Sequence, residues 1–474
     1  MRAKRIFISA DHGLAIVYFL QTDVVSSIIA AGVEVILLTD DELKEKIDQR
    51  FGRPGLTIEG LRLNQARNYF QNEHNSSQWW LDFFRRASAS SRMNLETVNN
   101  YVNWVKTEAP SKRRAIFPLV RMAVHLMRHS RSARQALVYR QHRFTPDIYG
   151  DLFEKYRPDL VVSSTAGWRL DRYILREARA HGVSTAAIVL GWDNPSSHAL
   201  PGAKIDHISC WSEAQKEELI LGSDWRPEQI NIGGIPSYDG YFRMQWQLNR
   251  AEYYRLHRLN PERKLLGYAC SFVTYSPNIQ NIEALARLVS SDQLAKPCQL
   301  LVRLHPNHFT KVRRWSSERE QIHKLVQEYP LVHLVEPVPL GGELGYYSGE
   351  DMPEKSSMMA HSDVFLTVYS TMVVEASIHE TPIISAVIDS PTGWPGEYSL
   401  PLSKIGGWPT HSRFRQAGAG RVATNPDELR QAINNYLGNP TLDLEAQRAF
   451  VRQECTFTDG SAGRHTAEHL LSLL

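Results

Sequence analysis

The chain has 474 residues, of which 42% are hydrophobic and 22% charged, a composition that excludes a disordered or low-complexity protein. At about 150 residues per domain, this length predicts two large or three ordinary domains. Lys and Arg number 54 against 51 Asp and Glu, and the resulting charge of +3 is too small to indicate nucleic-acid binding over the whole surface.

The start of the chain and its cysteines indicate a cytoplasmic protein. A short apolar run follows the basic residues at 2–5, but Asp11 and His12 end it too early for a signal peptide. No apolar run reaches the about 18–20 residues that a membrane-spanning helix needs. The four cysteines show neither CxxC pairing nor zinc-site spacing, so we expect a reducing compartment.

Short β-branched runs alternate with helical patterns from the first strand onward, which predicts parallel strands joined by crossover helices. In an N-terminal domain at 1–250 we expect strands at 6–9, 33–38, 159–163, 184–190, 205–210 and 230–232, and helices at 14–31, 171–181 and 212–221. In a C-terminal domain at 251–474 we expect strands at 264–269, 300–304, 332–335, 364–368, 383–386 and 421–422. The last helix, at 463–474, can pack on either domain.

A mostly helical insertion at about 78–146 interrupts the first series. It has no acidic residue between Glu108 and Asp147, but it contains nine Lys and Arg residues there. Its apolar residues recur at helical spacing, which predicts a basic amphipathic helix or a pair of such helices. These residues are Ile116, Leu119, Val120, Ala123, Val124 and Met127. Three interpretations stay open: a solvated face above a core stripe, a patch at 109–146 for anionic lipid headgroups or a lipid-phosphate acceptor, and an RNA-binding patch.

The segment 362–376 carries the most specific pattern. Its buried strand ends at Tyr369 and a helix is expected to open at Ser370 or Thr371, so backbone N–H groups and the positive helix end face the carboxyl edge of the sheet. That arrangement is typical of a diphosphate site. Glu375, about one helical turn further, can accept hydrogen bonds from ribose hydroxyls. An ordinary strand–helix unit with a capping Ser or Thr is the alternative.

This segment resembles the donor-binding signature of GT-B glycosyltransferases and of two relatives, the UDP-GlcNAc 2-epimerases and the CDP-glycerol glycerophosphotransferases. The sequence Arg303-Leu304-His305-Pro306 is similar to their strand-end Arg-x-His-Pro element, and 233–239 and 459–462 also match. The resemblance implies an α/β protein of the GT-B fold. Two Rossmann-like, doubly wound domains would face a cleft, with a helical insertion in the first and the nucleotide bound mainly on the second.

Within that resemblance, the donor site takes its residues from the ends of several strands. Arg303 and His305 are expected to meet the diphosphate, together with Ser370 and Thr371. Pro337 and Val338 lie where such folds bring loop backbone to the base. The turn 271–276, beginning at Ser271, can add a donor to a phosphate.

The candidate catalytic residues follow two strands of the first domain. Asp11-His12-Gly13 and the turn 191–194 should both point into the cleft. An inverting transferase needs a base at the acceptor hydroxyl, and Asp193 is the first candidate, followed by His12 and then by Asp11. Asp193 can also belong to a simple turn, because Asp-Asn-Pro favours turns.

The sequence lacks GxGxxG after the first strand and lacks GxxxxGK[ST] throughout, so NAD-type and nucleoside-triphosphatase functions lose their usual signals. Retaining GT-B enzymes commonly carry a pair of glutamates that ends at the ribose-binding position, and here the earlier position is Thr367. This favours inversion. We expect no metal or cofactor, since helix dipole and Arg303 can neutralise the leaving phosphate.

The sequence thus predicts an inverting, metal-independent glycosyltransferase that moves a sugar from a nucleotide-sugar donor, most simply UDP-linked, to a surface-glycan or lipid-linked acceptor. It would work in the cytoplasm, peripherally on the inner face of the cell membrane. A UDP-GlcNAc 2-epimerase, a glycerophosphotransferase of the CDP-glycerol type and a sugar-nucleotide-binding protein without chemistry remain as alternatives.

Overall fold

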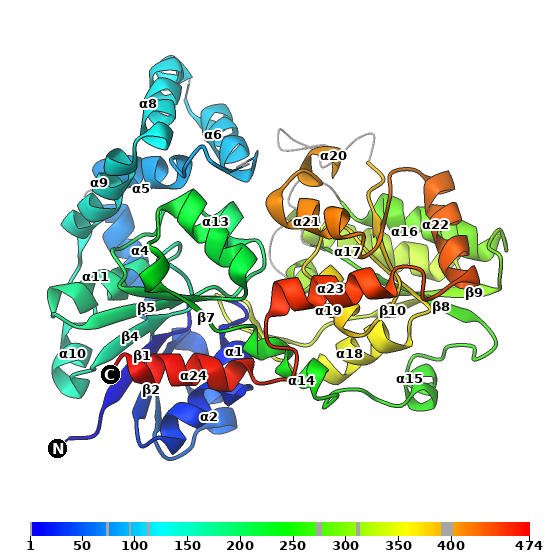
Figure 1. The fold of residues 1–474 in the computed structure, drawn as a ribbon, viewed down its shortest axis with the longest axis horizontal. Coiled ribbons are helices and arrows are strands. Elements are labelled where there is room, and N and C mark those ends of the chain that lie inside the picture. Colours follow the sequence, from blue (N-terminus) through cyan, green and yellow to red (C-terminus); the bar gives the residue numbers. More distant parts are fainter. Residues whose placement is uncertain are drawn as a thin grey trace.

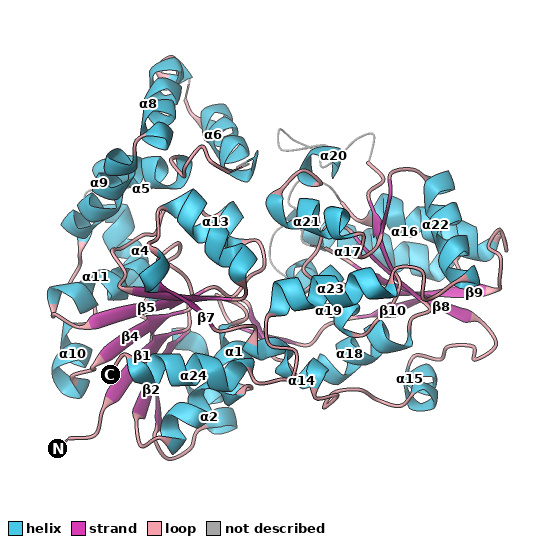
Figure 2. Cartoon of the chain, in the orientation of Figure 1, coloured by secondary structure: helices cyan, strands magenta, loops and turns pink. Residues whose placement is uncertain are grey.

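A computed structural model describes residues 2–72, 75–93, 96–110, 114–271, 277–309, 313–389 and 402–474. Two lobes lie side by side, and a group of helices projects from the top of the N-terminal lobe (Figure 1). Each lobe contains one parallel sheet with helices on both faces, as the cartoon coloured by secondary structure shows (Figure 2). No described helix is long and apolar enough to cross a membrane.

The N-terminal lobe is built on a seven-stranded parallel sheet of order β3-β2-β1-β4-β5-β6-β7. Its strands are β1 (Arg5–Ser9), β2 (Glu34–Thr39), β3 (Leu56–Gly60), β4 (Leu160–Ser163), β5 (Ser184–Ile188), β6 (His207–Cys210) and β7 (Ile230–Ile232). Its helices are α1 (Ala15–Leu20), α2 (Asp23–Ala30), α3 (Lys44–Phe51), α4 (Leu63–Asn72), α10 (Gly150–Tyr156), α11 (Arg172–Ala180), α12 (Asn194–Ser197), α13 (Glu213–Ser223) and α14 (Asp239–Phe242).

The C-terminal lobe is built on a six-stranded parallel sheet of order β10-β9-β8-β13-β14-β15. Its strands are β8 (Lys264–Ala269), β9 (Cys298–Arg303), β10 (Val332–Val335), β13 (Val364–Thr367), β14 (Ile383–Ala386) and β15 (Arg421–Ala423), beside a hairpin of β11 (Pro339–Gly341) and β12 (Tyr346–Tyr347). Its helices are α15 (Arg250–Leu256), α16 (Ile279–Ser290), α17 (Arg313–Glu328), α18 (Met352–His361), α19 (Met372–Ile378), α20 (Leu402–Ile405), α21 (Pro409–Ala417), α22 (Pro426–Gly438) and α23 (Leu444–Cys455).

The central strands are apolar on both faces because helices cover both sides of each sheet. Every residue of β4, β9, β13 and β14 is buried. The single helix expected at 14–31 is instead two helices. Thr22 breaks it, because its hydroxyl accepts a hydrogen bond from the Val24 N–H and caps α2.

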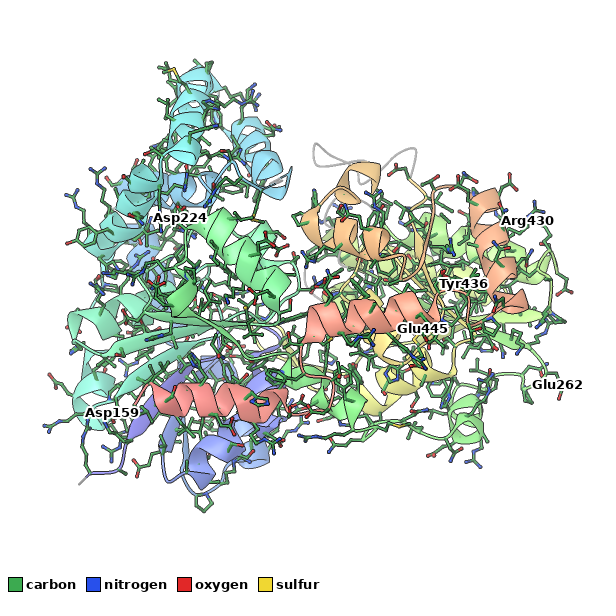
Figure 3. The ribbon with its side chains drawn as sticks, in the orientation of Figure 1. Asp159, Asp224, Glu262, Arg430, Tyr436 and Glu445 are labelled. Atoms are coloured by element: carbon green, nitrogen blue, oxygen red, sulfur yellow. The ribbon has the colours of Figure 1, made fainter. Side chains whose placement is uncertain are left out.

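The described part of the insertion contains the helices α5 (Asn75–Ala87), α6 (Glu96–Glu108), α8 (Phe117–His129) and α9 (Arg131–Arg140). Phe83, Phe117 and Val124 belong to a small core of their own. The ion pair of Arg134 with Asp224, both almost fully buried, ties α9 to the end of α13, where Figure 3 labels the aspartate.

The apolar pattern of α8 divides between two faces, which the sequence did not predict. Val120 and Val124 are buried, whereas Leu119, Met122 and Leu126 are 65%, 56% and 61% exposed. Ile116, also placed in the core stripe by its spacing, is exposed as well. The helix therefore carries a row of apolar side chains on its solvent side.

Two segments from the second half of the chain reach into the N-terminal lobe. Helix α24 (Ala462–Ser472) lies along α2 (Figure 1), and its Leu470 is fully buried in that lobe's core. Asp239 accepts hydrogen bonds from the first N–H groups of α24, those of Ala462 and Gly463. From the hairpin, the fully buried Tyr346 hydroxyl donates to the Ala10 carbonyl over 2.5 Å.

Candidate functional site

The carboxyl edges of the two sheets border one cleft with a cavity of about 700 Å³. In the N-terminal lobe its lining includes His12 after β1, and Trp192 and Asp193 after β5. In the C-terminal lobe it includes His305 after β9 and residues 369–371 after β13. Parallel strands deliver all of these residues to the same edge, which is why open α/β sheets bind ligands there.

A smaller cavity of about 190 Å³ adjoins this cleft on the C-terminal side and shares His305, Ser370 and Thr371 with it. Its lining includes seven of the residues predicted for donor binding: Arg303, His305, Pro337, Val338, Ser370, Thr371 and Glu375. Ser271 lines the larger cleft, and 272–276, the rest of its predicted turn, lie outside the described residues. The structure brings these residues together; what they bind stays a prediction.

The turn between β13 and α19 is tightly built. Tyr369 has φ +36°, a left-handed conformation that non-glycine residues rarely adopt. The Ser370 hydroxyl accepts a hydrogen bond from the Met372 N–H, and α19 begins at Met372, slightly later than expected. The ring of His411 from α21 lies 4.7 Å from that of Tyr369. The strained turn places residues 370–371 at the wall between the two cavities.

Glu375 is buried at the side of the smaller cavity, where Tyr241, Lys355 and Tyr238 contact its carboxylate. The Tyr241 hydroxyl donates to its carboxylate over 2.6 Å, and Lys355 Nζ lies 2.5 Å from the same oxygen. Neither Tyr241 nor Lys355 was predicted from the sequence, although both line this cavity.

Arg303 lines the smaller cavity, but its charge is already neutralised. Its Nη1 pairs with Glu354 over 2.7 Å, and its Nη2 pairs with Asp351; both carboxylates belong to the start of α18. The contact of this guanidinium with a diphosphate stays a prediction. In the structure Arg303 ties β9 to α18 beside the cavity, and Lys355 pairs with Glu375.

His305 and His12 share one arrangement of the imidazole. Nδ1 of His305 accepts a hydrogen bond from the Asn307 N–H, and Nδ1 of His12 accepts one from the Leu14 N–H, both over 3.1 Å. Burial, aided by the charges of neighbouring cationic groups, lowers the pKa of each ring to about 3. Each neutral ring therefore carries its proton on Nε2, so it can donate a hydrogen bond there but cannot accept a proton.

Asp193 lies at the start of α12, next to the buried Trp192. Burial raises the pKa of its carboxyl group, which makes the carboxylate a stronger base than in water. Trp192 holds the loop, because its Nε1 donates to Glu454 of α23 over 2.7 Å. The same carboxylate of Glu454 receives two hydrogen bonds from Arg413.

Asp11 does not line the cleft, contrary to the expectation from its position after β1. It is 1% exposed and accepts a hydrogen bond from the Asp171 N–H over 2.9 Å, and its carboxylate lies 3.3 Å from Arg169. These contacts hold the loop before α11. Of the three residues predicted to be catalytic, His12 and Asp193 line the cleft and Asp11 lies behind it.

The insertion supplies a wall of the cleft, which sequence reasoning missed. Arg85 and Arg86 of α5 and Tyr101 and Trp104 of α6 line the large cavity opposite the donor side. The signal available in the sequence was the density of aromatic and Arg residues at 79–86 and 101–104, outside the basic stretch at 109–146. Among the described residues, no cluster of His, Cys, Asp or Glu is arranged to hold a metal ion.

Two parallel-sheet domains that face a cleft, with a strand–turn–helix site on the second, define the GT-B fold, and this chain has that fold. It is similar over 99% of its length to the whole of a Neisseria meningitidis UDP-GlcNAc 2-epimerase bound to UDP-GlcNAc (TM-score 0.55, 12% identity). It is also similar to a Rickettsia africae glycosyltransferase (TM-score 0.53, 9% identity, 100% of this chain and 98% of that one).

A third similar structure is the Anabaena protein HepE in complex with UDP and glucose, with a TM-score of 0.51 and 10% identity over 99% of this chain and all of that one. No protein-family model and no curated protein matches the sequence. At such low identities these similarities establish the fold, and the reaction has to be argued from the residues at the cleft.

Proposed function

We propose that the protein is a glycosyltransferase that uses a nucleotide-sugar donor. This proposal is supported by one cleft whose C-terminal wall contains the residues predicted for donor binding, and whose N-terminal wall contains the half-buried carboxylate of Asp193 and an aromatic surface. UDP is the proposed nucleotide, because the similar Neisseria and Anabaena structures contain UDP-GlcNAc and UDP with glucose.

In the proposed complex, the diphosphate lies at the turn after β13. The backbone N–H groups of Ser370 and Thr371 and the Nε2–H of His305 would donate to its oxygens. Glu375, held by Tyr241 and Lys355, would accept hydrogen bonds from the ribose hydroxyls. Pro337 and Val338 would line the base.

The proposed reaction is a direct displacement at the anomeric carbon. The acceptor hydroxyl oxygen forms a bond to that carbon while the carbon–oxygen bond to the nucleoside diphosphate breaks, and Asp193 takes the hydroxyl proton. The leaving diphosphate keeps the electron pair, and the anomeric configuration inverts. His12 donates a hydrogen bond from Nε2 to the sugar or phosphate instead of acting as the base, because its Nδ1 is occupied.

The exposed row of α8 fits a lipid-linked acceptor on an anionic membrane. Leu119, Met122 and Leu126 share one helix face, and Arg121 and Arg131 are exposed on the same segment. Such a face can lie in the lipid headgroup region, with apolar side chains toward the acyl chains and Arg on the phosphates. This would make the protein a peripheral one on the cytoplasmic side of the membrane.

A thermal-shift panel of UDP, GDP, CMP and CDP conjugates tests the donor site, since a ligand that binds only the folded state raises Tm. We expect UDP-sugars to raise Tm in the wild type and in the matched control Glu445→Gln, but much less in Glu375→Gln. A response to CDP-glycerol alone would favour the glycerophosphotransferase. Epimerised UDP-sugar formed without an acceptor would favour the isomerase, and no response to any nucleotide would refute the proposed function.

A further inference from the structure

A second cavity, of about 440 Å³, lies beside the cleft on the N-terminal lobe. The two cavities share Arg86, Tyr101 and Trp168 in their linings, so they meet along one wall. The second cavity reaches from that wall toward Arg169 and Arg172 at the start of α11. Its lining contains none of the residues predicted for donor binding.

Positive charge exceeds negative charge around this cavity. Its lining contains four arginines and three carboxylates: Arg67, Arg86, Arg169, Arg172, Asp11, Asp82 and Glu343. The carboxylate of Asp82 is shared by two guanidinium groups, because it lies 2.8 Å from Arg85 and 3.0 Å from Arg172. Although burial opposes ionisation, the charges of Arg85, Arg172 and Arg86 hold the pKa of Asp82 well below its usual range. The lining thus contains four guanidinium groups and three carboxylates, and one of these carboxylates is shared with Arg85 outside the lining.

Arg86 is the cation of this group that has no ion pair among the described residues. It is exposed to the cavity, and its guanidinium lies over the ring of Tyr101 at 4.3 Å from the centroid. Cation–π contact leaves the edge of the guanidinium available, and its planar fork of N–H groups matches a carboxylate or a phosphate. Tyr101 thus orients a donor fork toward whatever enters from the cleft.

Two further donors at this wall lack acceptors among the described residues. Nε1 of Trp168 and Nε of Arg172 are buried atoms without a hydrogen-bond partner. Leaving a buried donor unpaired is unfavourable, so native proteins keep few of them. Trp168 also stacks on His198 with 4.6 Å between ring centroids, which fixes the indole beside the cleft. Unpaired hydrogen-bond donors, an excess of positive charge and aromatic faces are together typical of a site for an anionic, ring-shaped ligand.

We propose that this cavity binds the acceptor, and that the acceptor is a glycan bearing a carboxylate or phosphate group. Resting on the proposed transferase function, this inference places the charged sugar against Arg86 and the donors of Trp168 and Arg172. The neighbouring sugar would then lie in the cleft with a hydroxyl at Asp193. Trp168 and Tyr101 supply apolar faces on which sugar rings can pack.

Binding measured without any donor tests this inference by itself. The carboxylate arm compares tetragalacturonate with its carboxyl-reduced tetrasaccharide. The phosphate arm compares mannose 6-phosphate with mannose. Binding of each probe is measured by calorimetry and by tryptophan fluorescence. We expect at least one charged probe to bind roughly tenfold or more tightly than its uncharged counterpart, because charge-assisted hydrogen bonds contribute about 1.5–3 kcal/mol. The arm that shows the preference identifies the charged group.

The variant Arg86→Gln should lose most of the preference for the charged probe. The variant Arg86→Lys should keep part of this preference, because lysine retains the positive charge but lacks the planar set of guanidinium N–H donors. Arg430→Gln, which changes an exposed arginine of α22 in the other lobe (Figure 3), is the matched control and should keep it. Equal affinity for charged and uncharged probes, including no binding of either, would overturn the inference, as would a preference that survives in Arg86→Gln. Nucleotide thermal shifts are measured separately, so failure of the donor site is distinguishable from failure of this one.

Discussion

Replacing Glu454 by Gln removes the charge at the centre of a buried network that joins the two lobes. Glu454 is fully buried in α23 and accepts hydrogen bonds from Arg413 over 2.8 and 3.0 Å and from Trp192 over 2.7 Å. Arg413 also pairs with Glu218 of α13. The amide of the variant has nearly the same shape as the carboxylate, so the change tests charge more than packing.

Removing one partner of a buried ion pair costs about 3–5 kcal/mol, because a charge remains buried without full compensation. In cooperative units of about 150–250 residues, each kcal/mol of lost unfolding free energy lowers Tm by about 2–4 °C. We therefore expect the Tm of Glu454→Gln to lie about 6 °C or more below that of the wild type. The matched variant is Glu445→Gln on the same helix. It breaks the exposed pair with Arg448, in which the glutamate is 81% exposed, and such surface pairs contribute little to stability.

Differential scanning calorimetry of the wild type and the two variants measures this difference. The Tm of Glu445→Gln should stay close to that of the wild type, while Glu454→Gln melts clearly lower. Equal melting temperatures of the two variants would refute the reasoning, and would mean that Glu218 alone compensates the guanidinium of Arg413.

Three further predictions concern the site and the exposed helix. Asp193→Asn should lower turnover roughly 10²–10⁴-fold while leaving the nucleotide-induced rise in Tm unchanged, and turnover near the wild-type rate would exclude Asp193 as the base. Because the pKa of His305 is lowered to about 3, the ring gains a proton only well below neutral pH. Calorimetry should therefore show UDP-sugar affinity that is constant between about pH 5.5 and 8, whereas affinity rising as pH falls through this range would show an imidazolium at the diphosphate. The double variant Leu119→Glu with Leu126→Glu should lose sedimentation with phosphatidylglycerol vesicles, unlike the exposed control Leu256→Glu; wild-type protein that does not bind, or whose binding is insensitive to salt, would contradict the membrane surface.

The strands at the centre of each sheet could be predicted from the sequence because they are continuous apolar runs. Lys264–Ala269 and Ile383–Ala386 coincide with β8 and β14. Strand β3 was missed because it lies at an edge of the sheet, where only Leu56 and Ile58 of its five residues are buried. The helix break at Thr22 depends on one hydroxyl cap within an apolar stretch, and hydrophobic periodicity does not register such a cap.

The candidate site was predictable where each residue directly follows a strand, as Ser370 and His305 do, since topology alone carries those residues to one edge. The partners of Arg303 could not be predicted, because Asp351 and Glu354 come from a helix about fifty residues later. The wall formed by Arg86 and Tyr101 depends on how the insertion folds back over the cleft. That packing is set by tertiary contacts, not by any local pattern.

The return of α24 to the N-terminal lobe has a consequence for synthesis on the ribosome. Asp239 and its backbone partner in Ala462 lie 223 residues apart. At a translation rate of about 5–20 residues per second, α24 is synthesised about 10–45 s after Asp239. During that time the surface of α2 that α24 will cover is open to solvent and to other chains. The N-terminal lobe, whose strands are synthesised first, is therefore completed only after the strands of the C-terminal lobe have been synthesised.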